Sequence, residues 1–313
     1  MSSAPIHADG DARAGARRNL RSAPPHSLWA PWAFLAPFLL LFAAFTLWPL
    51  GQSLVLAFSQ TFGPKHSAFV GFDNFRFLLR DPLFWTALGN TALYTAGSVF
   101  IQLPIALGLA LLLNRPGLRG RAVFRLIFFA PSLVGLVFVA MVFSLLFQSR
   151  TGLINSGLHH LFPAWDPEFV WLDRHVMASL VVATVWLYAG FNMIYFLAAL
   201  QNVSRELLEA AGLDGAGPWA RFRHVILPEI RPVGGFVLLL SIIGSFQAFE
   251  LPWVLLNNSA GPDNRGLTIV MYLYQTGFLT GDLGYASAIG WILGLLLALA
   301  ALLQLRATRS EGN

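Results

Sequence analysis

The chain has 313 residues, of which 56% are hydrophobic and only 11% are charged, and its mean hydropathy is +0.64. A soluble domain carries about 25% charged residues, so this composition excludes a disordered chain and argues against a water-soluble globule. The formal net charge is +5, but the basic residues are thinly spread, which argues against a nucleic-acid partner. Cysteine is absent, so disulfides, thiolate metal sites and thiol redox couples are excluded.

The residues before about position 32 are rich in Ser, Ala, Pro and Arg, and we predict that residues 1–31 form a disordered cytoplasmic tail. The first long apolar run follows this tail. It is too long for the apolar region of a secretory signal, so we interpret it as a retained helix.

Six apolar segments are each long enough to cross, as a helix, the roughly 30 Å hydrocarbon core of a bilayer. They lie at about 32–58, 83–113, 126–147, 176–200, 233–256 and 285–305. The runs are continuous rather than alternating, which favours helices over barrel strands. We therefore predict an all-α membrane protein with six transmembrane helices in residues 32–309, followed by a short tail at 310–313.

The distribution of Lys and Arg predicts the orientation, because cytoplasmic loops carry an excess of positive charge. Fourteen of the 20 basic residues lie in the N-terminal tail, in the second-to-third and fourth-to-fifth connections, and at the C-terminal end. The smaller set is Lys65, Arg76, Arg80, Arg150, Arg174 and Arg265. We therefore expect both termini to be cytoplasmic and three loops to face outward.

The predicted cytoplasmic connection at 201–232 has internal order. Ser204 is a candidate N-cap for a short amphipathic helix, and Pro218 suits the first position of a second one. Leu227-Pro228 and Pro232 are expected to redirect the chain into the fifth span. A short helix at the membrane edge either lies on lipid headgroups, packs against the protein's own helix ends, or docks into a groove on a soluble partner.

The spacing within this connection resembles the EAA loop of importer-type ABC permeases. The family pattern is Glu-Ala-Ala, three residues, Gly, nine residues, Ile, any residue and Leu-Pro. Here the pattern is matched by Glu209-Ala210-Ala211, Gly215, Val225 in place of Ile, and Leu227-Pro228. Shorter stretches are similar to the sugar-uptake branch, which includes permeases for maltose, lactose-type sugars and glycerol 3-phosphate: Val70-Gly71-Phe72-Asp73-Asn74-Phe75, Gly190-Phe191-Asn192-Met193 and Gly261-Pro262-Asp263.

The resemblance implies the type I permease fold of ABC importers and a multi-pass location in the bacterial inner membrane. It also implies a transport subunit for a sugar or related polyol. The partners that it implies are cytoplasmic ABC ATPase subunits, a second permease subunit and an extracytoplasmic solute-binding protein. In the family the EAA loop docks into a cleft on the ATPase and transmits its motion. The ATPase-coupling residues expected on this basis are Glu209, Ala210, Ala211, Asp214, Gly215, Leu227 and Pro228.

The chain lacks the motifs for chemistry of its own. Its one lysine, Lys65, does not belong to a phosphate-binding loop, so ATP hydrolysis requires a separate chain. The histidines show no metal-binding spacing, and no nucleophile constellation stands out. We predict no catalytic residues, no metal and no cofactor.

Polar side chains inside the spans predict a passage for a polar solute. Aromatic rings cover the C–H faces of a sugar, and amide and carboxyl groups bond its hydroxyls. The candidates lie at helical spacing on the fourth and fifth spans: Tyr188, Asn192 and Tyr195, and Gln247, Glu250 and Trp253. A further polar face on the second span comprises Asn90, Tyr94, Ser98 and Gln102. Interhelical hydrogen bonding explains the Tyr and Asn residues equally well, and Trp253 also suits the outer aromatic belt.

A stand-alone secondary transporter or channel for a small polar solute is the alternative function. It predicts several proton- or ion-relay residues within the spans, whereas Glu250 is the one charged residue there. A membrane enzyme would need a catalytic cluster near the inner face, where the sequence offers mainly arginines.

Overall fold

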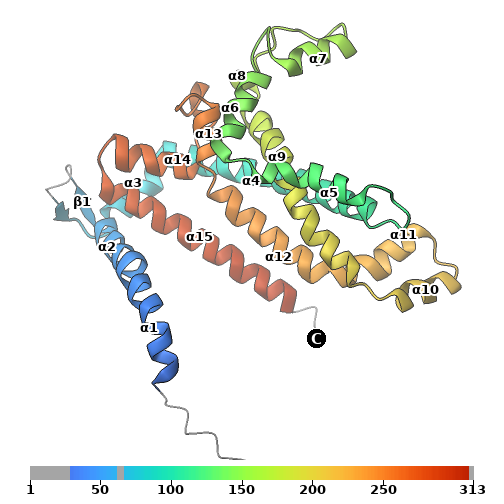
Figure 1. The fold of residues 1–313 in the computed structure, drawn as a ribbon. Coiled ribbons are helices and arrows are strands. Elements are labelled where there is room, and N and C mark those ends of the chain that lie inside the picture. Colours follow the sequence, from blue (N-terminus) through green and yellow to red (C-terminus); the bar gives the residue numbers. More distant parts are fainter. Residues whose placement is uncertain (1–28, 62–66, 310–313) are drawn as a thin grey trace, which may run out of the picture. The chain divides into compact units, whose positions relative to one another are not determined.

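The computed structural model describes residues 29–61 and 67–309 (Figure 1). Most of the tail that we predict to be disordered, and all of residues 310–313, lie outside this description. The chain divides into two compact units, one ending at Gln52 and the other beginning at Ser53.

The first unit contains α1 (Ala30–Phe42), a π-helical turn η1 (Ala43–Leu47) and the beginning of α2 (Trp48–Ala57). Together, residues Trp32–Ala57 are long and apolar enough to cross a membrane. This agrees with the first predicted span.

The second unit opens with a small antiparallel hairpin of β1 (Ser59–Thr61) and β2 (Ser67–Phe69), in which Ser59 pairs with Phe69. Every other element is helical. The longer helices are α4 (Pro82–Leu113), α9 (Val176–Gln201), α12 (Leu227–Phe246) and α15 (Leu283–Arg309). The shorter ones are α3 (Asp73–Arg80), α5 (Arg121–Phe129), η2 (Ala130–Leu133), α6 (Leu136–Leu146), α7 (Leu153–Leu161), α8 (Trp171–Arg174), α10 (Arg205–Leu213), α11 (Pro218–Arg221), η3 (Phe222–Ile226), α13 (Glu250–Leu255), η4 (Pro262–Asn264), α14 (Ile269–Tyr274) and η5 (Gln275–Leu279).

Across the described residues, five helices are long and apolar enough to span a membrane, or six if one bent pair counts as a single span. The prediction of an all-α membrane protein is confirmed, with the small hairpin as its exception. The cytoplasmic orientation of both termini stays a prediction.

The third predicted span is not one straight helix. It begins at Arg121, and its two halves, Arg121–Leu133 and Leu136–Leu146, meet at an angle of 99°. Pro131 lies in the 3-10 turn that ends the first half, and Gly135 precedes α6 in an extended conformation. The proline lacks the N–H that a continuous α-helix needs, and its ring clashes with the preceding turn, so the helix breaks there.

The fifth predicted span also has different limits. Residues Pro218–Phe246 form one continuous helical run, so Leu227-Pro228 and Pro232 do not redirect the chain but lie within α12. At the other end the helix stops at Phe246, and α13 begins only at Glu250. Gln247, Glu250 and Trp253 therefore do not share one continuous helical face, contrary to the prediction.

Twice in the described part of the chain, a π-helical turn precedes a proline. The N–H of Trp48 bonds to the carbonyl of Ala43 just before Pro49, and the N–H of Leu227 bonds to that of Phe222 just before Pro228. A proline cannot donate to the residue four before it. The π-helical turn contains one residue more than an α-helical turn and is therefore wider. The helix can continue past the proline because this wider turn tolerates the missing hydrogen bond.

Residues 257–284, which we predicted to be an outer loop, contain a short apolar helical run at Ile269–Leu279. This run is too short to cross a bilayer. It packs against α4 and α15 and contributes Ile269 and Met271 to a buried cluster.

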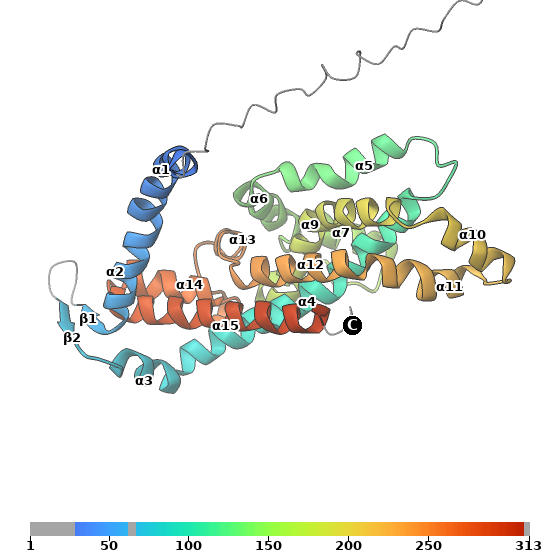
Figure 2. The ribbon, with the colours of Figure 1, turned by 90° about the horizontal axis from the view of Figure 1, so that it is seen from below.

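Three helices form the centre of the second unit. α4 packs along α9, and α12 contacts both of them. Figures 1 and 2 show α12 lying between α9 and α15. α10, α11 and the C-terminal end of α15 lie at one end of this unit, and α3, α8 and α13 lie toward the other (Figure 1).

Candidate functional site: a polar cavity and a coupling loop

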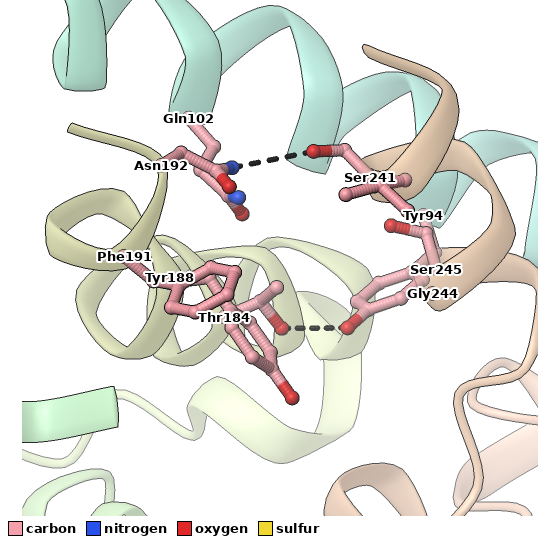
Figure 3. Close-up of a pocket in the computed structure, with 10 residues that line it drawn as sticks. Tyr94, Gln102, Thr184, Tyr188, Phe191, Asn192, Ser241, Gly244 and Ser245 are labelled. Atoms are coloured by element: carbon pink, nitrogen blue, oxygen red, sulfur yellow. Dashed lines mark hydrogen bonds between the residues drawn. The ribbon is translucent and has the colours of Figure 1, made fainter. Parts of the chain in front are cut away.

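A cavity of about 540 Å³ lies between the three central helices (Figure 3). α4 supplies Tyr94 and Gln102 to its wall, whereas α12 supplies Ser241, Gly244 and Ser245. The residues from α9 are Thr184, Tyr188, Phe191 and Asn192. Helical spacing explains the grouping, because these residues recur at intervals of three, four or eight along each helix and so share one face.

Two hydrogen bonds fix the cavity wall across helices. The hydroxyls of Tyr94 and Thr184 lie 2.6 Å apart and join α4 to α9. The Asn192 amide donates to the Ser241 hydroxyl at 3.2 Å and joins α9 to α12. Within the described part of the chain, the buried Gln102 amide forms no hydrogen bond, so its donors and its acceptor are available to a solute.

A second cavity of about 540 Å³ adjoins the first. Tyr94, Tyr188 and Gly244 line both, so the two spaces meet at these residues. Gln247 and Glu250 line only the second and are exposed. Gln247 and Glu250 lie at the break between the end of α12 and the start of α13, where the chain is not one continuous helix. This exposed position spares the carboxyl group of Glu250 the large desolvation that it would suffer in a lipid-facing span.

The structure brings four of the six predicted passage residues to these cavities: Tyr188, Asn192, Gln247 and Glu250. It places Tyr195 elsewhere, with its ring 5.3 Å from that of Phe191 and 6.0 Å from that of Phe236. It also places Trp253 elsewhere, stacked 5.8 Å from Phe249. Tyr195 and Trp253 thus take part in aromatic packing and do not line either cavity.

Several lining residues were not candidates from the sequence: Thr184, Ser241 and Ser245. Their signal was their spacing, since Thr184 lies four residues before Tyr188 and Ser241 four before Ser245. This signal is weak because Ser and Thr are common in membrane helices for packing alone. Tyr94 and Gln102 did lie on a predicted polar face, but Asn90 of that face instead donates to the carbonyls of Asn264 and Leu267.

The predicted coupling loop forms a helix and a tight turn at one end of the unit. α10 carries Glu209, Ala210 and Ala211 and ends before Asp214. Gly215 adopts a φ of +76°, which favours glycine, and reverses the chain after the helix. The N–H of Ala216 then bonds to the Ala211 carbonyl at 2.9 Å.

The loop is fastened to the same helices that line the cavity. Leu208 packs against the cluster formed by the neighbouring ends of α4, α9 and α12. Arg221 closes the turn by donating to the Ala216 carbonyl at 2.8 Å. Leu227 and Pro228 belong to α12 itself, so the last part of the motif is the base of a central helix.

The side of the loop opposite Leu208 is exposed. Glu209 and Ala210 are exposed, and Leu213 and Trp219 leave 90% and 69% of their surface uncovered. We considered three environments for α10: lipid headgroups, the protein's own helix ends, and a groove on a soluble partner. Packing against the protein's own helix ends accounts only for the side that carries Leu208. The opposite side remains available to lipid or to another protein.

A helical membrane protein with a polar cavity between its central helices and an anchored helical loop at one end has the architecture of a transport permease. Residues 102–309 match the family of binding-protein-dependent transport system inner membrane components, and the chain belongs to this family. It is a transport subunit of the inner membrane.

Named relatives agree with this assignment. The chain is 38% identical to the arabinooligosaccharides transport system permease protein AraP of Bacillus subtilis, covering 90% of this chain and 89% of AraP. It is 35% identical to the lactose transport system permease protein LacF of Rhizobium radiobacter, covering 90% and 94%. A crystal structure of a bacterial ABC transporter that imports the acidic polysaccharide alginate matches with a TM-score of 0.78 at 25% identity, covering 90% of this chain and 96% of that one.

Proposed function

We propose that this chain is a permease subunit of an ATP-driven importer that carries a sugar or a related polyol across the inner membrane. The observation that carries the proposal is the polar cavity between α4, α9 and α12, in a chain of this family. The relatives named for arabinooligosaccharide and lactose transport support a saccharide substrate.

The cavity has the chemistry that a saccharide needs. Tyr94, Tyr188 and Phe191 offer ring faces for its C–H surfaces. Asn192 and Gln102 offer amides that both donate and accept, which suits hydroxyl groups. Glu250 and Gln247, at the second cavity, extend the polar path.

Energy reaches the cavity through the coupling loop, by docking of Glu209, Ala210, Ala211, Asp214 and Gly215 on a cytoplasmic ABC ATPase. Leu213 and Trp219 lie beside these residues and are exposed, which supports a protein partner. A short helix that docks in a groove of another protein buries large apolar side chains of this kind. The continuous helical run Pro218–Phe246 then transmits the motion of the loop to the cavity wall. At 1.5 Å per residue, it extends about 35 Å from Pro218 to Ser241 in the cavity wall.

Transport follows as a shift between two states. A solute-binding protein delivers the sugar at the outer face, and ATP binding closes the two ATPase subunits. Their motion rocks this chain against a second permease subunit, so that the cavity opens alternately to each side. The loaded binding protein drives the change through its different affinities for the two states.

The alternative, a stand-alone secondary transporter or channel, finds less support. Proton- or ion-driven carriers place several ionisable groups within their spans. Here the cavities are lined by one carboxylate, Glu250, together with hydroxyls, amides and rings.

Uptake into vesicles tests the substrate. The transporter, purified with its co-purifying subunits, is reconstituted with its binding protein and a panel of labelled mono- and oligosaccharides and polyols. We expect ATP-dependent uptake of at least one saccharide or polyol, and loss of that uptake in Asn192→Leu. Uptake that proceeds at the same rate without ATP would contradict the proposal.

Co-purification tests the coupling loop. The double variant Glu209→Lys with Gly215→Trp places a wrong charge and a bulky ring on the open side of the loop, so the ATPase chain should be lost. Glu168→Lys is the matched control, since it reverses an exposed charge whose ion pair with Arg150 contributes little stability. If the double variant retains its ATPase and drives uptake, the docking assignment is wrong.

A further inference from the structure

A separate pocket of about 620 Å³ lies where the start of α9, α4 and the loop before α14 meet. Arg174 and His175 enter it from the junction of α8 and α9, and Arg265 enters from the loop. None of these three residues lines either of the two cavities of the passage. We call this the outer basic pocket, because its arginines belong to the set that the charge distribution places outside the cell.

The pocket is held in shape by its own neighbours. Asn90 on α4 donates to the carbonyls of Asn264 at 2.8 Å and of Leu267 at 3.1 Å, which ties the loop on either side of Arg265 to the helix. The His175 ring stacks on Phe169 at a centroid separation of 5.0 Å. These contacts hold the segments that carry Arg265 and His175 against their neighbours.

The positive charge of this pocket is poorly balanced. Two other arginines of the outer set, Arg76 and Arg150, form ion pairs at 3.0 Å. Among the described residues, Arg174 forms no ion pair. Arg265 approaches Asp263 at 3.4 Å, but the two side chains are 48% and 80% exposed. A pair this exposed is weak and is readily exchanged for another carboxylate.

From this geometry we propose that the outer basic pocket receives an acidic side chain of the solute-binding protein. Guanidinium groups recognise carboxylates through paired, charge-assisted hydrogen bonds. The pocket stands apart from the passage, so its occupant is not the solute in transit. The proposal rests on the proposed function, including the outward placement of this end, because that is where a binding protein arrives.

The test uses the complete transporter in nanodiscs of neutral lipid. ATPase rate is measured against the concentration of sugar-loaded binding protein for the wild type and for Arg174→Glu with Arg265→Glu. We expect the half-saturating concentration to rise about tenfold in the double variant, with the basal and maximal rates unchanged, because charges at the edge of an interface act mainly on association. Added salt should weaken the wild type but not the variant.

Arg150→Glu is the matched control, since it reverses an outer arginine that lies outside the pocket, and its half-saturating concentration should stay within about twofold of the wild type. An unchanged half-saturating concentration in the double variant overturns the proposal. So does a shift that appears only when anionic lipid is added, which would make a lipid headgroup the occupant. A wild type that the loaded binding protein does not stimulate would instead refute the proposed function, so the two failures are distinct.

Discussion

Gly190 sets how closely two helices of the second unit approach. A Cβ atom at this position would lie 1.7 Å from the backbone carbonyl oxygen of Phe128 on α5. No side chain fits in that space, so only glycine allows α5 to lie directly on α9. The same stretch of α9 carries Tyr188 and Asn192 of the cavity wall, which makes the close contact part of how the site is positioned.

We predict that Gly190→Ala lowers thermal stability. The added methyl group pushes α5 away from α9, and overpacking of this kind costs about 1–3 kcal/mol. The unfolding midpoint of the purified protein in detergent should therefore fall. Gly108→Ala in α4 is the control, because a Cβ there meets nothing within 4 Å and alanine favours a helix. Equal midpoints for Gly190→Ala and the wild type would contradict the assignment.

Single residues differed in how well the sequence identified them. The helix and turn that carry the Glu-Ala-Ala motif could be located from the sequence because the spacing of the motif is fixed, and the positive φ of Gly215 gives a physical reason for its glycine. The coupling role of these residues stays a prediction. Tyr188 and Asn192 were predictable because their polar groups are unusual in an apolar span. Ser241 was not, because a serine hydroxyl in a membrane helix usually bonds within its own helix.

At the scale of elements, Asp81 joins three helices. It caps the first turn of α4, where its Oδ1 accepts the N–H of Leu83 at 2.9 Å. Its Oδ2 accepts the hydroxyl of Tyr285 on α15 at 2.6 Å and also that of Tyr272 on α14. The carboxylate is buried, with 7% of its surface exposed, so these donors replace its lost hydration.

We predict that Asp81→Ala destabilises the protein by about 2–4 kcal/mol, because it leaves two tyrosine hydroxyls without their acceptor and removes a helix cap. The unfolding midpoint in detergent reports this change. Asp73→Ala provides the comparison: its ion pair with Arg76 is 65% and 75% exposed and should contribute little. Similar midpoints for the two variants would show that the Asp81 cluster does not hold these helices together.

The existence of the long helices was predictable from apolar length, whereas their breaks were not. Pro131 interrupts its span, yet Pro104 lies inside α4 without ending it. The outcome depends on whether neighbouring helices and wider turns satisfy the carbonyls that a proline leaves free, and this is tertiary information. The run Ile269–Leu279 was missed because it falls below the length that a membrane span requires.

At the scale of the whole second unit, the helical run Pro218–Phe246 leads from the predicted coupling loop to the two adjoining cavities. The loop helix α10 lies just before the start of this run, and Glu250, which lines the second cavity, lies just beyond its end. The sequence located the residues at both ends of this run but did not predict the continuous helix that joins them. It assigned the first half of this run to a separate short helix.

We predict that Glu250→Ala lowers uptake of the transported solute severalfold while leaving expression and the unfolding midpoint unchanged. The side chain is exposed at the cavity, so its removal changes solute contacts and not packing. Uptake by the reconstituted transporter and its solute-stimulated ATPase rate measure the effect. Glu168→Ala removes an exposed carboxylate elsewhere and should behave as the wild type. An unaltered dependence of both rates on solute would remove Glu250 from the passage.

The π-helical turn at Phe222–Ile226 lies within the run Pro218–Phe246, directly before Leu227-Pro228. The turn is wider than an α-turn, so its five residues complete about the same rotation that four complete in an α-helix. The extra residue is therefore absorbed with little rotation of Pro218–Arg221 about the helix axis relative to Ser241. Deleting it would leave Pro228 after an ordinary α-turn, where its missing N–H and its ring break or kink the helix. The wide turn thus keeps the run from the predicted cytoplasmic loop to the cavity wall continuous.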